Sequence, residues 1–221
     1  MKKYLCLIIS LINTVATAVF LILTDKDIVP IHYDFKGNVD SEGSKWTFMI
    51  LPVTLVVMAI IFLIVEKIMG KDINYQKNSR YSVICINGLF FMMLCMFWVL
   101  LILSINGNGN IVGKAVPFIC SVFLGLIGVL FSNYMPKLKP NSTFGIRLPV
   151  TMNNEIVWKK THRFAGKVGM IGSFLVLILG FVSLFSGNYS AIVSIGGIFV
   201  FVICIAVLPT IYAYKVKKQI L

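Results

Sequence analysis

The chain has 221 residues, of which 58% are hydrophobic and 13% are charged, and its formal net charge is +12. A soluble domain is closer to half apolar and a quarter charged. The apolar residues lie in blocks of about 20, the length of helix that crosses a hydrocarbon core of about 30 Å. Because a bilayer offers no water to backbone amides, each block must satisfy its own hydrogen bonds as a helix. The composition therefore excludes a soluble globular fold and predicts an all-α membrane protein.

The first apolar block, residues 4–24, follows Lys2 and Lys3 and must be compared with a signal peptide. Its apolar run is too long for one, and no small-residue cleavage site precedes the acidic segment 25–27. We therefore expect a retained first helix. The full set of predicted membrane helices is 4–24, 47–69, 81–105, 115–135, 167–186 and 191–214.

The joint between the first two helices, residues 25–46, is longer than a simple connection needs. Pro30 favours an extended backbone before it, and Gly37 suits a turn. We expect a small hairpin-like element on the surface. Its candidate contact residues are Pro30, His32, Tyr33, Asp34, Gly37 and Asp40.

Four residues of this joint also have the chemistry of ligands for a hard or borderline cation: His32, Asp34, Asp40 and Glu42. Their spacing does not match a calcium loop, because the glycine and the final glutamate fall at the wrong positions. We favour the interpretation that His32 hydrogen-bonds within the loop and that the acids face water. No metal and no cofactor are assigned.

Basic residues are distributed very unequally between alternate joints. With the N-terminus inside, the cytoplasmic segments carry sixteen of the twenty Lys and Arg residues. The external segments carry only Lys26, Lys36, Lys45 and Lys114. The positive-inside rule therefore predicts that both termini are cytoplasmic and that the joint 25–46 is external. Topology explains the net charge, so direct nucleic-acid binding is not predicted.

Ionisable residues are absent from the central part of every predicted helix, since Glu66 and Lys67 lie near one helix end. Ion-coupled transporters usually place such groups at membrane depth. A small-solute transporter or channel is therefore the alternative function rather than the first. An enzyme is not predicted, because no Ser-His-Asp order, His-Glu-x-x-His motif or phosphate loop is present. His32 and His162 also fall on opposite sides of the membrane in the predicted topology, so they cannot form one site.

The joint 136–166 is the second long polar segment. Thr151, followed by Glu155, predicts an N-cap for a short helix at about 152–164. Such a helix would place Trp158 at the lipid headgroups, with its basic residues towards anionic lipid. This interpretation leaves the residues before Thr151 unexplained, and they have the composition of a specific turn.

A recognisable set of residues runs through this joint: Asn141, Phe144, Gly145, Arg147, Pro149, Thr151, Glu155, Trp158, His162 and Arg163. With them the joint resembles the signature of the SdpI family of bacterial membrane proteins. The external joint, with Pro30, His32 and Gly37, resembles the domain of unknown function 1648, which often precedes that signature. The resemblance implies a two-helix unit at 1–70 and a four-helix unit at 71–221.

What the resemblance to the SdpI family implies is immunity. Founding members protect a cell from a secreted antimicrobial peptide, and some hold an ArsR-type repressor at the membrane. For this chain, it implies a multi-pass protein in the lipid bilayer of the bacterial cytoplasmic membrane. The external loop would meet a peptide toxin, which the chain resists or senses. The cytoplasmic loop would carry any signal by recruiting a repressor.

Overall fold

The computed structural model describes residues 4–107, 109–141 and 143–220. Its elements in chain order are α1 (Leu5–Ile22), β1 (Ile28–Tyr33), β2 (Val39–Ser44), η1 (Lys45–Met49), α2 (Ile50–Met69), α3 (Ile73–Gln76), α4 (Ser79–Asn106), α5 (Gly109–Tyr134), η2 (Met135–Lys137), α6 (Pro149–Met152), α7 (Glu155–Leu184), η3 (Gly187–Tyr189), α8 (Ser190–Val202), η4 (Ile203–Val207) and α9 (Leu208–Lys218).

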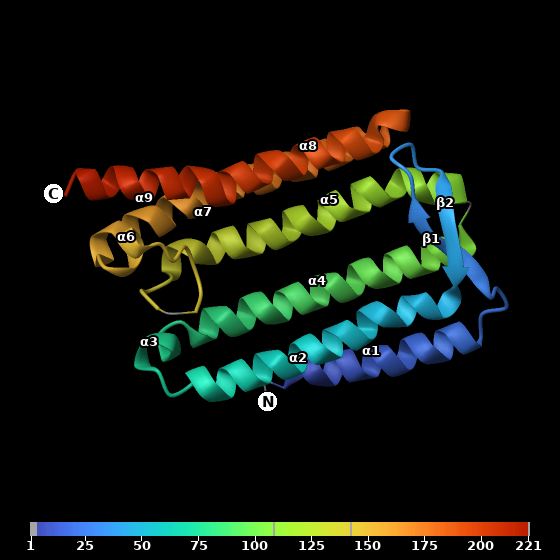
Figure 1. Ribbon diagram of the computed structural model, residues 1–221, viewed down its shortest axis with the longest axis horizontal. Helices are drawn as coiled ribbons and strands as arrows, with labels where there is room; N and C mark the ends of the chain where they lie inside the picture. The colour runs from blue at the N-terminus through green and yellow to red at the C-terminus, as the bar shows by residue number, and fades with distance from the viewer. Residues whose placement is uncertain (1–3, 108, 142, 221) are drawn as a thin grey trace.

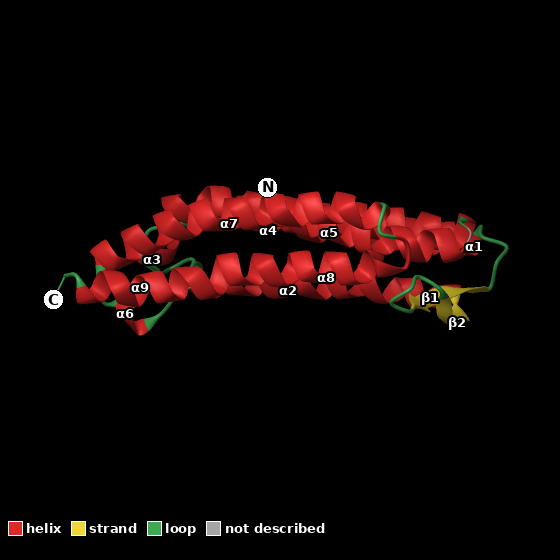
Figure 2. Cartoon of the chain, turned by 90° about the horizontal axis from the view of Figure 1, so that it is seen from above, coloured by secondary structure: helices red, strands yellow, loops and turns green. Residues whose placement is uncertain are grey.

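The described part of the chain has six helical segments that are long and apolar enough to cross a membrane. They lie side by side, with the β1–β2 hairpin at one end and α3 and α6 at the other (Figure 1). The helices form two layers, with α1, α4, α5 and α7 in one and α2, α8 and α9 in the other (Figure 2). The predicted all-α membrane fold with six spans is confirmed.

The long helix α7 is where the structure departs from the prediction. The expected short helix 152–164 and the expected span 167–186 form one continuous helix, Glu155–Leu184. Nothing in the sequence between them breaks a helix, since no proline is present there. At 1.5 Å per residue its 30 residues measure about 45 Å, so its ends extend beyond a core of about 30 Å.

Small residues bring α7 into close contact with α5. A Cβ atom built on Gly128 would lie 2.4 Å from the Ser173 hydroxyl, and one on Gly169 would lie 2.5 Å from the Ser132 hydroxyl. Each helix therefore presents a glycine to a serine of the other. Without a hydrophobic driving force between helices in lipid, this close approach of backbones is what supplies van der Waals contact.

The first helices are joined to α4 by two clusters of buried apolar residues. One cluster contains Cys6, Leu55, Ala59, Phe90 and Leu94. The other contains Leu21, Val29, Phe97, Leu101 and Ile105. α4 therefore packs on α1, α2 and the first strand, and the division of the chain between residues 70 and 71 stays a prediction.

The buried carboxylate of Glu66 lies at the last turns of α2. It is 4% exposed and accepts a hydrogen bond from the Tyr75 hydroxyl of α3. Burial is the main reason that the pKa of Tyr75 is raised, and the neighbouring carboxylate raises it further. Tyr75 therefore stays a neutral donor, and the pair fastens α3 to the end of α2.

The predicted hairpin is present and is fixed to the helix ends below it. β1 and β2 pair antiparallel, and Gly37 at the turn has φ +83°. The Ser104 hydroxyl donates to the Pro30 carbonyl at 2.8 Å, and Lys26 Nζ donates to the Ile105 carbonyl at 2.6 Å. The hairpin is thus held on α4 by side-chain bonds to backbone carbonyls.

Both ends of the described chain point towards the end of the bundle opposite the hairpin (Figure 1). The basic residues predicted to be cytoplasmic gather at that same end, except Lys2 and Lys3, which lie outside the described residues. An even number of spans requires this arrangement of the termini. Which end faces the cytoplasm stays a prediction from the positive-inside rule.

Gly113 offers a test of hairpin docking. A Cβ atom at Gly113 would lie 2.1 Å from the Gly37 carbonyl oxygen and 2.6 Å from Tyr33. We expect Gly113→Ala to push the hairpin off α5 and to cost about 1–3 kcal/mol. Hydrogen exchange in detergent or nanodiscs should show faster exchange in residues 28–44. The control is Gly196→Ala, where nothing lies within 4 Å of the new Cβ. Equal exchange in both variants would contradict the docking contact.

Candidate functional site

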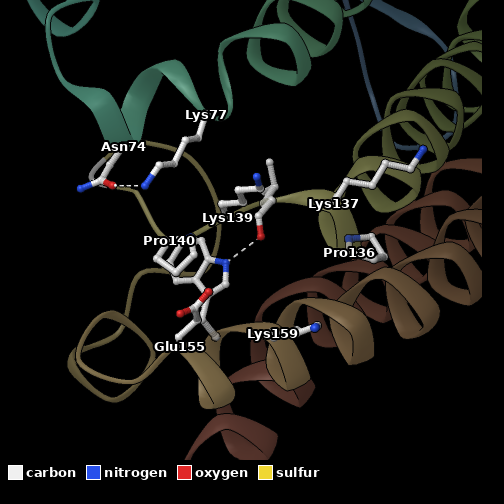
Figure 3. Close-up of a pocket in the computed structure, with 10 residues that line it drawn as sticks. Asn74, Lys77, Pro136, Lys137, Lys139, Pro140, Glu155 and Lys159 are labelled. Atoms are coloured by element: carbon white, nitrogen blue, oxygen red, sulfur yellow. Dashed lines mark hydrogen bonds between the residues drawn. The ribbon is translucent and has the colours of Figure 1, made fainter.

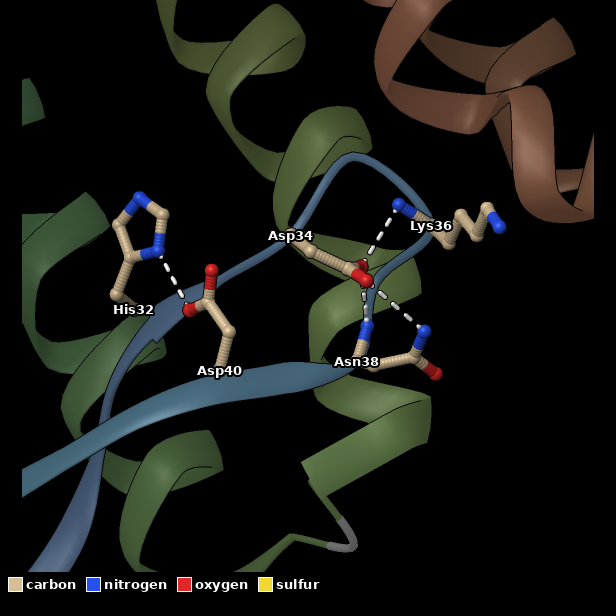
Figure 4. Close-up of polar contacts among 5 residues, drawn as sticks. All are labelled: His32, Asp34, Lys36, Asn38 and Asp40. Atoms are coloured by element: carbon tan, nitrogen blue, oxygen red, sulfur yellow. Dashed lines mark hydrogen bonds and ion pairs between the residues drawn. The ribbon is translucent and has the colours of Figure 1, made fainter.

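The hairpin is the first of two candidate surfaces, at opposite ends of the bundle. His32 Nδ1 lies 2.6 Å from Asp40 Oδ1, across the two strands (Figure 4). The predicted hydrogen bond of His32 within the loop is confirmed. The two side chains are nevertheless 69% and 44% exposed, so the pair presents a polar patch to the surroundings.

Asp34 has a different role, because it closes the turn. Its carboxylate accepts hydrogen bonds from the main-chain N–H groups of Lys36 and Asn38, each at 2.8 Å, and from the Asn38 side-chain amide at 3.0 Å (Figure 4). The bonds from Asn38 hold the pKa of Asp34 below its usual value. This stabilisation is complete above the unfolded-state pKa and is lost as pH falls through the folded-state pKa.

Exposure separates the predicted hairpin residues. Pro30 and Tyr33 are half-buried and Gly37 is buried, so these three support the hairpin. Sequence reasoning missed Phe35, which is 70% exposed at the turn. Its signal was available, because an aromatic residue within a polar turn sequence seldom has a core to enter. In the described residues, no group of three or more His, Cys, Asp and Glu side chains is placed to hold a metal ion.

The second candidate surface is the signature loop, residues 138–148, together with α6 and the first turns of α7. Asn141 is 3% exposed and folds the loop around its amide. Its Oδ1 accepts from the N–H groups of Thr143 and Phe144, at 2.9 and 2.6 Å. Its Nδ2 donates to the carbonyls of Lys139 and Phe144, both at 2.9 Å.

A second buried amide, Asn78, supports the same loop from the start of α4. Its Nδ2 donates to the Lys139 carbonyl at 2.9 Å, and its Oδ1 accepts from the Lys139 N–H at 2.8 Å. The Asn78 side chain thus satisfies both main-chain groups of Lys139, as the backbone of a neighbouring strand would. Sequence reasoning missed Asn78, because it lies 61 residues away and no local pattern marks it.

Trp158 is buried beneath the loop, so the prediction that it anchors a helix at the lipid headgroups is wrong. Its side chain is 1% exposed, and the indole N–H donates to the Leu138 carbonyl at 2.9 Å. Its ring stacks on His162 with centroids 4.0 Å apart. Because the indole N–H bonds to a protein carbonyl, it does not need a partner at the membrane–water interface, and the ring can be buried.

His162 fixes the next part of the loop through both ring nitrogens. Nε2 accepts the Ile146 N–H at 3.0 Å, and Nδ1 lies 2.9 Å from the Trp158 carbonyl. Because Nε2 must be unprotonated to accept, the ring is neutral with its proton on Nδ1. Gly145 has φ +114°, and a Cβ there would lie 2.5 Å from Nε2, so only glycine fits beside the imidazole.

Thr151 completes the set, although the prediction that it caps a short helix at 152–164 is wrong. Its hydroxyl donates to the Ile146 carbonyl at 2.7 Å and accepts from the Leu148 N–H at 2.9 Å. The N-cap of α7 is Asn154 instead, which accepts from two amides of the first turn at 2.9 and 3.1 Å. Thr151 therefore belongs to the loop and stabilises its last turn.

The signature residues thus divide into two groups. The side chains of Asn141, Thr151, Trp158 and His162 are buried and satisfy the loop. Gly145 and Phe144 are half-buried, and the Phe144 ring centroid lies 5.8 Å from that of Phe131. The second group is exposed: Arg147, Pro149, Glu155 and Arg163. Only the exposed group is available to meet another molecule.

Six apolar spans, an ordered hairpin at one end and a side-chain-satisfied loop at the other define a multi-pass membrane protein. Residues 137–213 match the SdpI/YfhL protein family, and this segment contains every signature residue. The chain is 26% identical to the immunity protein SdpI of Bacillus subtilis (strain 168), over 100% of this chain and 98% of that protein. No solved structure matches it.

These matches confirm the resemblance to the SdpI family predicted from the cytoplasmic joint. The family segment begins at the last residue of η2 and ends within α9. The hairpin lies before it, so the resemblance of that region to the domain of unknown function 1648 stays a prediction.

The buried indole can be tested by removing its N–H. Trp158→Phe keeps an aromatic ring but leaves the Leu138 carbonyl without its donor, which should cost about 1–3 kcal/mol. The matched control is Trp46→Phe, because Trp46 is 46% exposed, and its cost should stay within about 0.5 kcal/mol. Denaturant titration of both variants in the same detergent measures the difference. Equal stability of the two would contradict the burial of Trp158.

Proposed function

We propose that this chain is a membrane immunity protein that protects a bacterial cell from a secreted antimicrobial peptide. The observation that carries the proposal is similarity, along the whole chain, to an immunity protein. The hairpin is the proposed contact surface, because it is fixed to the helix ends and yet carries exposed side chains.

The chemistry of the hairpin surface supports a peptide as its ligand. Ile31 is 42% exposed and Phe35 70%, and the same hairpin carries the exposed His32–Asp40 pair. Aromatic and apolar side chains on a rigid element provide contact area at low entropic cost, and polar neighbours provide orientation. An amphipathic peptide at the membrane surface presents the complementary combination.

The sidedness of the protein follows from its charges in this proposal. The hairpin end carries Lys26, Lys36, Lys45 and Lys114, whereas the opposite end carries the other described basic residues. The positive-inside rule then places the hairpin outside and both termini in the cytoplasm. A secreted peptide reaches the hairpin without crossing the membrane.

Any signal to a cytoplasmic repressor has to use the exposed half of the signature. Trp158 and His162 are buried, so a partner cannot touch them without unfolding the loop. Arg147, Glu155 and Arg163 are exposed at the same end of the bundle. We propose these three as the surface that recruits an ArsR-type repressor when the peptide is bound outside.

Sidedness can be measured by labelling single cysteines in a background without the native ones. Asn38→Cys in the hairpin should react with an impermeant thiol reagent in intact cells. Lys160→Cys, which is exposed on α7, should react only after the membrane is opened. The reverse pattern would overturn the proposed orientation.

Survival of a peptide-sensitive bacterium tests the proposed division between the two surfaces. His32→Ala and Phe35→Ala should each reduce survival about tenfold or more, because truncating an anchor side chain at an interface costs about 1–2 kcal/mol or more. Ser41→Ala, an exposed change on the neighbouring strand, is the control and should protect fully.

Arg163→Ala should leave survival intact and reduce recruitment of a repressor to the membrane, followed by fluorescence of a tagged repressor. Membrane levels of all variants are compared by immunoblot. Full protection by the His32 and Phe35 variants, at equal membrane levels, would exclude the hairpin as the contact surface. Loss of survival in the Arg163 variant would exclude the division of roles.

A further inference from the structure

A basic pocket of about 570 Å³ lies beside the signature loop, at the end of the bundle opposite the hairpin. Four lysines from three segments line it: Lys77 follows α3, Lys137 and Lys139 lie in and after η2, and Lys159 is in α7 (Figure 3). Among the described lining residues, Glu155 alone is acidic. The pocket therefore has a large excess of positive charge.

The walls of the basic pocket are held rigidly by the bonds of the signature loop. The backbone of Lys139 is fixed on both its N–H and carbonyl by Asn78, and the carbonyl also accepts from Asn141. The neighbouring Leu138 carbonyl accepts the Trp158 N–H. Lysine side chains thus project from a backbone that does not have to be ordered when a ligand binds, which lowers the cost of binding.

The ammonium groups of the pocket lack carboxylate partners. Lys77 Nζ donates to Asn74 Oδ1 at 3.2 Å, and Lys137 Nζ lies 4.7 Å from the centre of the Tyr134 ring. Within the residues that the structure describes, none of the four lysines forms an ion pair with an acid. Clustered unneutralised cations in a concave site attract an anion.

The position of the pocket along the helices selects the kind of anion. Tyr134 is the last residue of α5, three residues before Lys137, and its ring lies 5.7 Å from that of Tyr81. Tyrosines gather at the boundary between membrane and water, so this pair marks the headgroup level. A basic pocket between helices at that level has the chemistry that binds phospholipid headgroups.

We propose that the basic pocket binds the phosphate group of an anionic phospholipid headgroup, of the phosphatidylglycerol type. Lys139 and Lys159 approach the phosphate from the loop and from α7. The proposal rests on neither the immunity function nor the sidedness, because it needs only an anionic lipid in the leaflet that the pocket faces.

The test uses the full-length chain in a neutral detergent and native mass spectrometry with added phosphatidylglycerol or phosphatidylcholine. The wild-type chain should bind phosphatidylglycerol in preference to phosphatidylcholine. Lys139→Gln together with Lys159→Gln should weaken binding of phosphatidylglycerol about 25-fold, at about fivefold per lysine.

The control is Lys215→Gln together with Lys218→Gln, which removes the same charge from exposed positions of α9, away from the pocket. This control should bind as the wild type does. An equal loss in both double variants would reduce the effect to general charge attraction and overturn the pocket. Equal binding of phosphatidylglycerol and phosphatidylcholine by the wild-type chain would show that no anionic headgroup is selected, and would overturn it as well. Thermal unfolding without lipid should be the same for both variants, which separates lost binding from lost folding.

Two competitors separate the lipid from other anions. Inorganic phosphate and a glutamate-rich peptide are each added to the complex with phosphatidylglycerol at the concentration of the lipid. Retention of the lipid in both cases supports the headgroup site. Displacement by inorganic phosphate would assign the pocket to a free phosphate ion, and displacement by the peptide to an acidic protein segment, and either outcome overturns the proposal.

Discussion

The structure depends on one constraint, which is that backbone amides and carbonyls at the membrane boundary need partners. Helices satisfy their own groups, but the signature loop is not helical and sits against the helix ends. Side chains supply the hydrogen-bond partners that a helix or a strand would otherwise provide. The amides of Asn78 and Asn141 and the ring nitrogens of Trp158 and His162 each bond to a main-chain group of the loop. A leftover buried polar group would cost about 1–3 kcal/mol, so these residues are needed together.

The sequence was sufficient to predict the elements that follow from local chemistry. Apolar blocks predict the spans, because length and hydropathy alone decide whether a helix crosses a bilayer. Pro30 and Gly37 predict the hairpin, because proline restricts the residue before it to an extended conformation and glycine permits the positive φ that a turn needs. For the signature loop, the sequence predicted which residues matter but not which of them are buried or what they contact. Whether Trp158 faces lipid or protein depends on the Leu138 carbonyl, which comes from another segment. The partner role of Asn78 depends on packing of α4 against the loop, so no pattern within either segment reveals it.

The buried and the exposed residues of the signature have different roles in the loop. The residues that make the signature recognisable are mostly those that hold the loop in place, so they report on its shape rather than on its partner. The shape of the loop leaves three charged signature residues exposed: Arg147, Glu155 and Arg163. The same loop also lines part of the basic pocket. At the other end, Gly37 and Gly113 fix the hairpin to α5 and leave its His32–Asp40 pair exposed. At each end of the helix bundle, buried contacts therefore hold a segment whose other side chains are exposed.

Buried side chains, rather than water, satisfy the main-chain groups of the signature loop. Hydrogen exchange of the full-length chain in nanodiscs measures this at the N–H groups of Ile146 and Leu148, which donate to His162 and Thr151. Both amides should be protected to about the same degree as those in the first turns of α7. Exchange at the rate of an unstructured peptide at these two amides would contradict it.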